Sequence, residues 1–91
     1  MSQNFNVESY QRAQHAISEL KTAIFMILME HSEEGLRNVE IGKKLGINMG
    51  HKGRHDGYIP RAMLDMMETE GTVEQYSNQK WRLCVDNSSS E

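Results

Sequence analysis

Two short helical patterns followed directly by a hairpin pattern, between Asn38 and Trp81, constrain the fold of this chain most. Asn38 can cap the first helix, because an asparagine side chain accepts a hydrogen bond from a first-turn amide. Gly46 can end the same helix, because glycine adopts the left-handed conformation common at helix ends. The apolar positions between these two residues have helical spacing: Val39, Ile41 and Leu45. The sequence therefore predicts a short helix with a defined start and end.

A second helix is predicted to begin at Asp56 as its cap and to run to about Glu70, with Gly71 as the stop. Pro60 is tolerated because first-turn amides lack intrahelical partners. The main apolar stripe of this helix contains Ile59, Met63, Met66 and Met67, flanked by Ala62 and Leu64. Two strands are predicted to follow, at residues 72–76 and 80–85, with the turn at 77–79.

The connection between the two helices, residues 47–57, is predicted to be a loop because it contains three glycines. A simple helix-turn-helix joins its helices by three or four residues. The connection in this chain is longer than that simple turn by about half a dozen residues. The turn is therefore expanded into a glycine-rich segment that carries basic side chains.

A long helix is predicted to start between Val7 and Gln11 and to end near His31, before a turn at 32–35 and a one-bridge strand at 36–37. Its core-facing stripe is predicted to contain Ala13, Ala16, Ile17, Leu20, Ile24, Ile27 and His31. Phe25, Met26 and Met29 project away from that stripe, so the helix needs cover on two sides. A homodimer through the 16–31 helix is one way to supply this cover, and burial within one monomer is the other.

Length and composition limit the number of domains and the cellular location of the chain. Ninety-one residues allow one domain, and we expect a flexible N-terminus at 1–7, a domain at 8–85 and a disordered tail at 86–91. No apolar run approaches the ~20 residues of a membrane span, and we see no signal peptide. The single cysteine, Cys84, cannot form an internal disulfide bond. These features favour a cytoplasmic protein that is not in a membrane.

Charge is unevenly distributed along the chain, whose formal net charge is −3. Residues 37–61 contain six basic and two acidic side chains and so carry +4, whereas the rest, with four basic and eleven acidic side chains, carries −7. A basic segment in an acidic frame is typical of a local phosphate-facing patch. The alternative is an ordinary solvated surface with chance segregation of charge.

Two segments resemble winged helix-turn-helix DNA-binding domains of the bacterial or phage type. Residues 37–47, RNVEIGKKLGI, resemble the strand and second helix of that family. Residues 62–74, AMLDMMETEGTVE, resemble the end of its recognition helix and its first wing strand. The resemblance extends over about residues 16–85, and Gly50-His51-Lys52-Gly53 is similar to stand-alone or nuclease-appended bacterial modules. It implies a mainly α fold with a small β-hairpin, namely a winged helix-turn-helix with an expanded turn before the recognition helix.

The resemblance implies that the recognition helix enters the major groove of DNA and that the wing lies beside the backbone. The helix body carries acidic residues, so contact is expected at the helix start and in the preceding loop, where the helix dipole favours an anion. The candidate DNA-binding residues are Lys43, Lys44, His51, Lys52, Arg54, His55, Tyr58, Arg61, Lys80 and Arg82. For each lysine alone, an unremarkable solvated surface position is the alternative. Arg82 can equally be an outward-facing strand residue without a role in binding.

Other chemistries have weaker patterns. His51 and His55 have metal-ligand spacing only on a helix, which the surrounding glycines disfavour, so we expect no metal site and no cofactor. The glycines of residues 50–57 lack the spacing of a nucleotide-binding loop. Cys84 is expected to be a buried structural thiol, and Trp81 a core anchor rather than a base-stacking platform. No catalytic pair is evident, and we expect that the chain is not an enzyme.

Two functions remain open at the level of sequence. The first is a double-stranded DNA-binding module, acting as a transcriptional regulator or an accessory domain of a nucleic-acid-processing system. The second is a winged helix that binds proteins, through dimerisation or as an adaptor, without binding DNA. The +4 segment favours the first function, and the acidic second helix favours the other.

Overall fold

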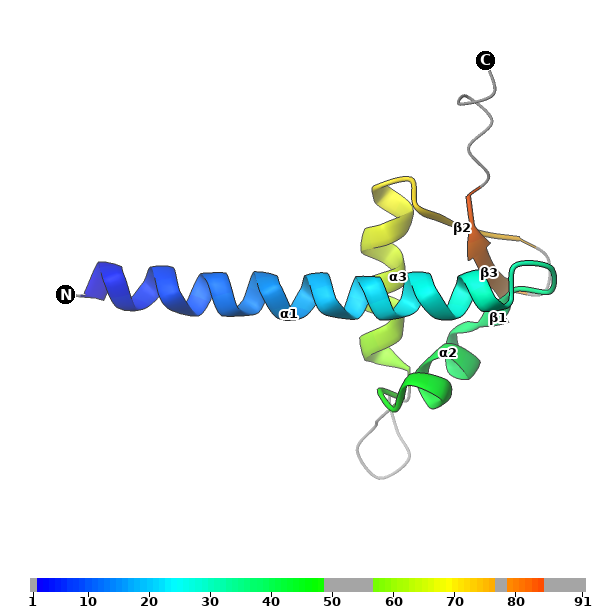
Figure 1. The fold of residues 1–91 in the computed structure, drawn as a ribbon, viewed down its shortest axis with the longest axis horizontal. Coiled ribbons are helices and arrows are strands. Elements are labelled where there is room, and N and C mark those ends of the chain that lie inside the picture. The colour runs from blue at the N-terminus through cyan, green and yellow to red at the C-terminus, as the bar shows by residue number, and fades with distance from the viewer. Residues whose placement is uncertain (1, 49–56, 77–78, 85–91) are drawn as a thin grey trace, which may run out of the picture.

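The computed structural model describes residues 2–48, 57–76 and 79–84, with side chains from residue 7 onward. The described chain is mainly helical with a small antiparallel sheet, as predicted (Figure 1). In chain order its elements are α1 (Ser2–Glu30), β1 (Leu36–Arg37), α2 (Asn38–Leu45), α3 (Tyr58–Thr69), β2 (Val73–Gln75) and β3 (Lys80–Leu83).

The sheet has three strands in the order β1-β3-β2, and both pairings are antiparallel. The two-residue strand β1 pairs Leu36 with Trp81, so the predicted short strand at 36–37 is confirmed. The hairpin of β2 and β3 pairs Val73 with Leu83 and continues in a bond from the Tyr76 amide to the Lys80 carbonyl oxygen, 2.9 Å. Residues 77 and 78 of the predicted turn lie outside the described residues.

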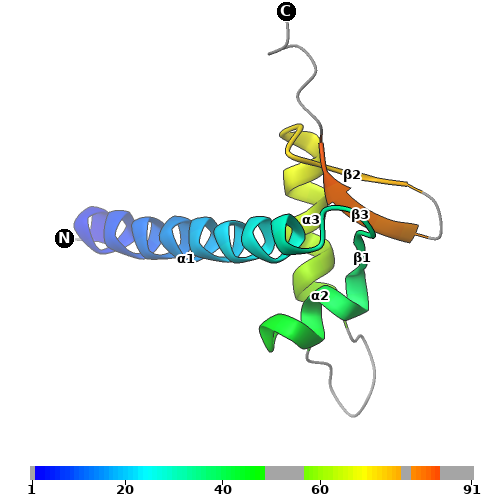
Figure 2. The ribbon, with the colours of Figure 1, turned by 45° about the vertical axis from the view of Figure 1, so that its right-hand side comes forward.

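Helix α1 begins at Ser2, several residues before the predicted start. At 1.5 Å per residue its 29 residues are about 43 Å long. Only its C-terminal half crosses α3 and the sheet, and its N-terminal half projects from the rest of the molecule (Figures 1 and 2). The prediction that Ala13 and Ala16 face the core is therefore wrong, because both lie on the projecting half and are exposed.

The core lies where the C-terminal half of α1, α2, α3 and the sheet meet. It consists of Ile24, Leu28, Leu36, Ile41, Met63, Leu64, Met67, Val73 and Trp81. Leu28 was not among the predicted core positions, whereas the core role predicted for Trp81 is confirmed. The prediction that Phe25, Met26 and Met29 project away from the core is also confirmed, because their side chains are 39%, 55% and 53% exposed.

The ends of α2 differ in how well they were predicted. The cap residue is Arg37 rather than Asn38, and the Arg37 amide donates to Glu40 Oε1 at 2.8 Å. Asn38 is the first helical residue, and its Nδ2 donates to the Gly57 carbonyl oxygen at 3.1 Å. The predicted stop at Gly46 is confirmed, since this glycine has φ +75°.

Helix α3 is preceded by Gly57 with φ +86°, while the predicted cap Asp56 lies outside the described residues. The predicted end at Glu70 and Gly71 is confirmed, with Gly71 at φ +84°. The predicted apolar stripe is wrong in part, because Leu64 is fully buried whereas Met66 is 37% exposed. The buried face of α3 is therefore rotated toward Pro60 and Leu64, which pack against neighbours from other elements.

Candidate nucleic-acid interface

An open groove lies between the starts of α2 and α3 and the β2–β3 hairpin. Its lining consists of Arg37, Asn38, Val39, Arg61, Gln75, Gln79 and Trp81. The groove thus brings together residues from four separate parts of the chain. Two other hollows, one between α1 and the end of α3 and one along the N-terminal half of α1, do not contain residues from both helix starts.

A strand pairing and a side-chain hydrogen bond hold the groove together. The antiparallel register of β1 and β3 places Arg37 opposite Lys80 and Leu36 opposite Trp81, which ties the start of α2 to the hairpin. The bond from Asn38 Nδ2 to the Gly57 carbonyl oxygen ties the start of α3 to the start of α2. Arg61, whose amide donates to the same carbonyl oxygen at 3.0 Å, lies one turn into α3 and reaches the groove.

The lining of the groove is cationic and amide-rich. Among the described residues, the lining contains two arginines, two glutamines and one asparagine, and none of these lining residues is acidic. Arg37 and Arg61 are both exposed, whereas Trp81 in the same lining is buried, with 6% of the residue accessible. Such a surface attracts an anion and offers amide groups that donate and accept hydrogen bonds.

The predicted binding residues are divided between this groove and other surfaces. Lys43 and Lys44 are exposed in the last turn of α2, where cations are favoured by the helix dipole, and they do not line the groove. Tyr58 is exposed in the first turn of α3, close in sequence to Arg61. The other predicted residues of the connecting segment, His51, Lys52, Arg54 and His55, lie outside the described residues.

The two predicted residues of β3 have different environments. Lys80 is half-buried opposite Arg37 in the sheet. Arg82 is held within the hairpin, because its Nε lies 2.6 Å from Glu74 Oε2 and its guanidinium lies 4.4 Å from the centre of the Tyr76 ring. Arg82 is therefore an ordered part of the hairpin rather than an extended cation.

The sequence-based list of candidate binding residues does not contain Arg37, Gln75 and Gln79, which line the groove. Arg37 was counted in the basic segment, but its place beside the hairpin follows from the register of β1 and β3, which the sequence does not reveal. Gln75 and Gln79 carry no charge and have no local pattern that marks them. Only the fold brings these three side chains beside Arg61.

Two groups of the described chain have shifted pKa values. The hydrogen bond with His31, at 2.7 Å, lowers the pKa of the Glu34 carboxyl group. Burial raises the pKa of the Cys84 thiol, and the negative charge of Glu74 adds to this effect. The Cys84 thiol is therefore protonated at neutral pH and a poor nucleophile.

Among residues 7–48, 57–76 and 79–84, no three His, Cys, Asp or Glu side chains are grouped so that they could hold a metal ion. His51 and His55, the pair considered as ligands, lie outside these ranges. No described helix is both long and apolar enough to cross a membrane.

Comparisons of this chain with protein-family models, with curated proteins and with solved structures find no match.

Proposed function

We propose that this chain is a winged-helix module that binds double-stranded DNA. Two helices followed by an antiparallel hairpin is the element order of a winged helix, and the order α1-β1-α2-α3-β2-β3 is compatible with it. In this proposal α3 is the recognition helix, and the β2–β3 hairpin is the wing that lies beside the DNA backbone.

The observation that carries the proposal is the groove between α3 and the hairpin. Arg37 and Arg61 supply positive charge for phosphates, and arginine also reads guanine edges through two parallel bonds. Gln75 and Gln79 lie on the wing and supply amide groups that donate hydrogen bonds to phosphate oxygens of the backbone. Phosphate contacts position the duplex, while contacts to base edges give sequence preference.

The charges of α3 favour its N-terminal end as the end that approaches DNA in this proposal. Asp65 and Glu68 are exposed on the helix body and would repel phosphates. The first turn instead carries Arg61 and Tyr58, and the positive end of the helix dipole favours an anion there. Residues 49–56 precede this end in the sequence, and contacts from Lys52 and Arg54 belong to the proposal.

The proposal is tested by fluorescence anisotropy with a labelled mixed-sequence duplex of about 20 base pairs, titrated at several salt concentrations. We expect affinity to fall steeply with salt, since each neutralised phosphate contributes a slope of about −0.9 in the double-logarithmic plot. Arg61→Ala should weaken binding about tenfold and reduce the slope by about one.

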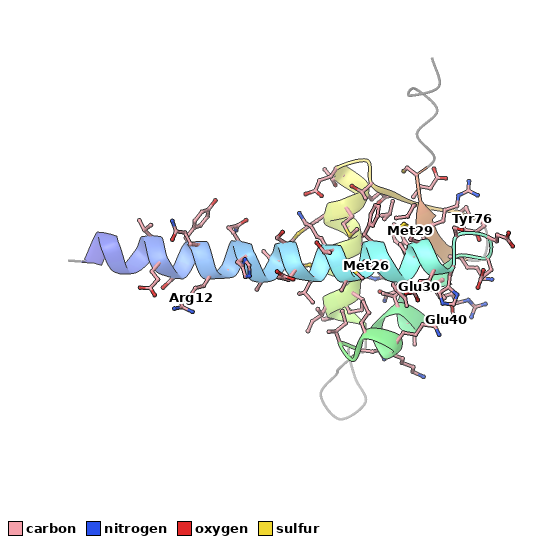
Figure 3. The ribbon with its side chains drawn as sticks, in the orientation of Figure 1. Arg12, Met26, Met29, Glu30, Glu40 and Tyr76 are labelled. Carbon is pink, nitrogen blue, oxygen red and sulfur yellow. The ribbon has the colours of Figure 1, made fainter. Side chains whose placement is uncertain are left out.

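Arg12→Ala is the matched control, because Arg12 is an equally charged and exposed residue on the projecting half of α1 (Figure 3). This variant should bind like the unchanged protein. Absence of binding at low salt, or an equal loss in both variants, would contradict the proposed interface.

A protein-binding winged helix is the alternative, and the exposed face of α3 favours it. Met66 is 37% exposed beside the acidic residues Asp65 and Glu68, which suits a partner with basic and apolar side chains. The same titration distinguishes the two functions, because a protein-binding module gives no salt-dependent anisotropy change with duplex DNA.

A further inference from the structure

One face of α1 carries an uncharged stripe along nearly its whole length. Its members follow one another at intervals of three and four residues and therefore lie on one side of the helix. We call this set the outer stripe: Val7, Gln11, Gln14, Ser18, Thr22, Phe25 and Met29. All seven side chains are exposed, although they lie on both the projecting half and the half that covers the core.

The outer stripe is symmetric in sequence about Ser18. Val7 and Met29 each lie eleven residues from Ser18, and Gln11 and Phe25 each lie seven residues from it. Two such helices placed antiparallel, with Ser18 opposite Ser18, therefore meet residue for residue along about 33 Å.

We propose that the chain forms a homodimer in which two α1 helices pack antiparallel along the outer stripe, with the two-fold axis at Ser18. The interface is isologous, as in most homodimers. The apolar side chains at the N-terminal end of one helix cover the apolar side chains at the C-terminal end of its partner. The small Ser18 side chains allow the two helix axes to approach closely at the centre.

The projecting half of α1 supports a second copy as the partner. Val7 and Tyr10 on this half are 52% and 65% exposed, and no described element packs against them. An isolated helix of about fifteen residues is marginal in water. The projecting half needs a neighbour, and another α1 offers the exposed Phe25 and Met29 of its outer stripe. Figure 3 labels Met29 on this helix.

The charges of the projecting half fit this arrangement. Glu8 pairs with Arg12 at 3.1 Å, and His15 lies 3.5 Å from Glu19 within the same helix. All four lie on one flank of α1, and none of the seven residues of the outer stripe is charged. The seam is therefore uncharged in both protomers, while its flank is polar and solvated.

A hollow beside the outer stripe gives the interface a second contact. It lies between α1 and the end of α3 and is lined by Ser18, Lys21, Thr22, Phe25, Met67, Glu70 and Thr72. Lys21 and Glu70 form an ion pair of 2.5 Å at its edge. In the antiparallel register, Gln14 of one protomer faces Thr22 of its partner, and Tyr10, one turn away on the same side, fills the hollow.

Sedimentation equilibrium of the full chain tests the dimer independently of DNA binding. The unchanged protein should have a mass of about twice 10.5 kDa at high concentration. Ser18→Lys places two ammonium groups at the two-fold axis and should weaken self-association at least tenfold. Ala16→Lys is the matched control, because Ala16 is also small and exposed but faces away from the stripe.

Ala16→Lys should associate like the unchanged protein. A monomer at every concentration, or equal weakening by the two variants, would overturn the proposal. Helical circular dichroism of both variants confirms that the domain is folded, which the exposed positions of Ser18 and Ala16 lead us to expect.

Disulfide cross-linking tests whether the two α1 helices of the dimer run antiparallel. The variants are made in a Cys84→Ser background, which removes the native thiol. Chains with Val7→Cys and chains with Met29→Cys should cross-link to each other when mixed and oxidised, because the antiparallel register brings these positions together. Neither variant should cross-link to itself. Self-linkage of Val7→Cys would indicate a parallel pair, and absence of linkage in the mixture would reject the register.

Discussion

At the scale of single residues, Gly57 explains how the start of α3 is fixed. Its φ of +86° is in the left-handed region, and its carbonyl oxygen accepts bonds from both Asn38 Nδ2 and the Arg61 amide. A Cβ atom at Gly57 would lie 2.6 Å from Asn38 Nδ2. Position 57 therefore requires glycine for two reasons: the backbone is left-handed there, and a side chain would collide with Asn38, which lines the groove.

We expect Gly57→Ala to destabilise the protein more than Gly71→Ala. Both glycines have φ near +85°, so each substitution carries a left-handed strain of about 1–2 kcal/mol. A Cβ at Gly71 has no atom within 4 Å, whereas one at Gly57 displaces Asn38. Free energies of unfolding from urea denaturation measure the difference, and equal losses would show that the close contact at Gly57 is unimportant.

The candidate site could be predicted from sequence only where charge marks a residue. Arg61 follows a glycine-rich basic segment at a helix start, so composition and capping rules point to it. Gln75 and Gln79 have no such mark, and Arg37 reaches the groove because β1 pairs with β3. Cross-strand register depends on long-range pairing, which a local pattern does not contain.

At the scale of elements, most boundaries could be read from the sequence because they are set by local chemistry. Gly46 and Gly71 end their helices at the predicted positions. The buried faces were predicted less well, since the choice between Leu64 and Met66 depends on which elements cover α3. Periodicity finds a helix, but its neighbours decide which side of that helix is buried.

Leu28 and Met29 are adjacent on α1 and provide a test of its two faces. Leu28 is fully buried, so Leu28→Ala should lower the free energy of unfolding by about 2–5 kcal/mol. Met29 is 53% exposed, and Met29→Ala should cost less than about 1 kcal/mol. Both substitutions are compared in the Ser18→Lys background, so that lost dimerisation does not contribute. Similar losses would contradict the orientation of α1.

At the scale of the whole molecule, a small domain carries a helix that extends well beyond it (Figure 2). The sequence indicated a helix with apolar spacing throughout, and this pattern placed Ala13 and Ala16 in a core that does not reach them. Helical periodicity cannot distinguish a face buried in the same chain from a face left for a partner. The projection is a tertiary property of the fold.

Amide hydrogen exchange should reveal this division within α1. We expect residues 8–16 to exchange rapidly in dilute solution and to become protected as concentration rises, because the dimer shields the projecting half. Residues 20–28, which pack against the core, should be protected at all concentrations. Ser18→Lys should remove the concentration dependence, and protection of residues 8–16 that is constant with concentration would contradict this account.

The most direct test of DNA binding at the groove is a titration of the isotope-labelled protein with duplex DNA, followed by amide NMR. At low salt, the largest shift changes should occur at Arg37, Arg61 and Gln75, and added salt should reverse them. Amides of residues 8–16 on the projecting half of α1 should change little. Absence of shifts at low salt, or shifts concentrated on the outer stripe, would contradict the assignment of the groove as the DNA-binding surface.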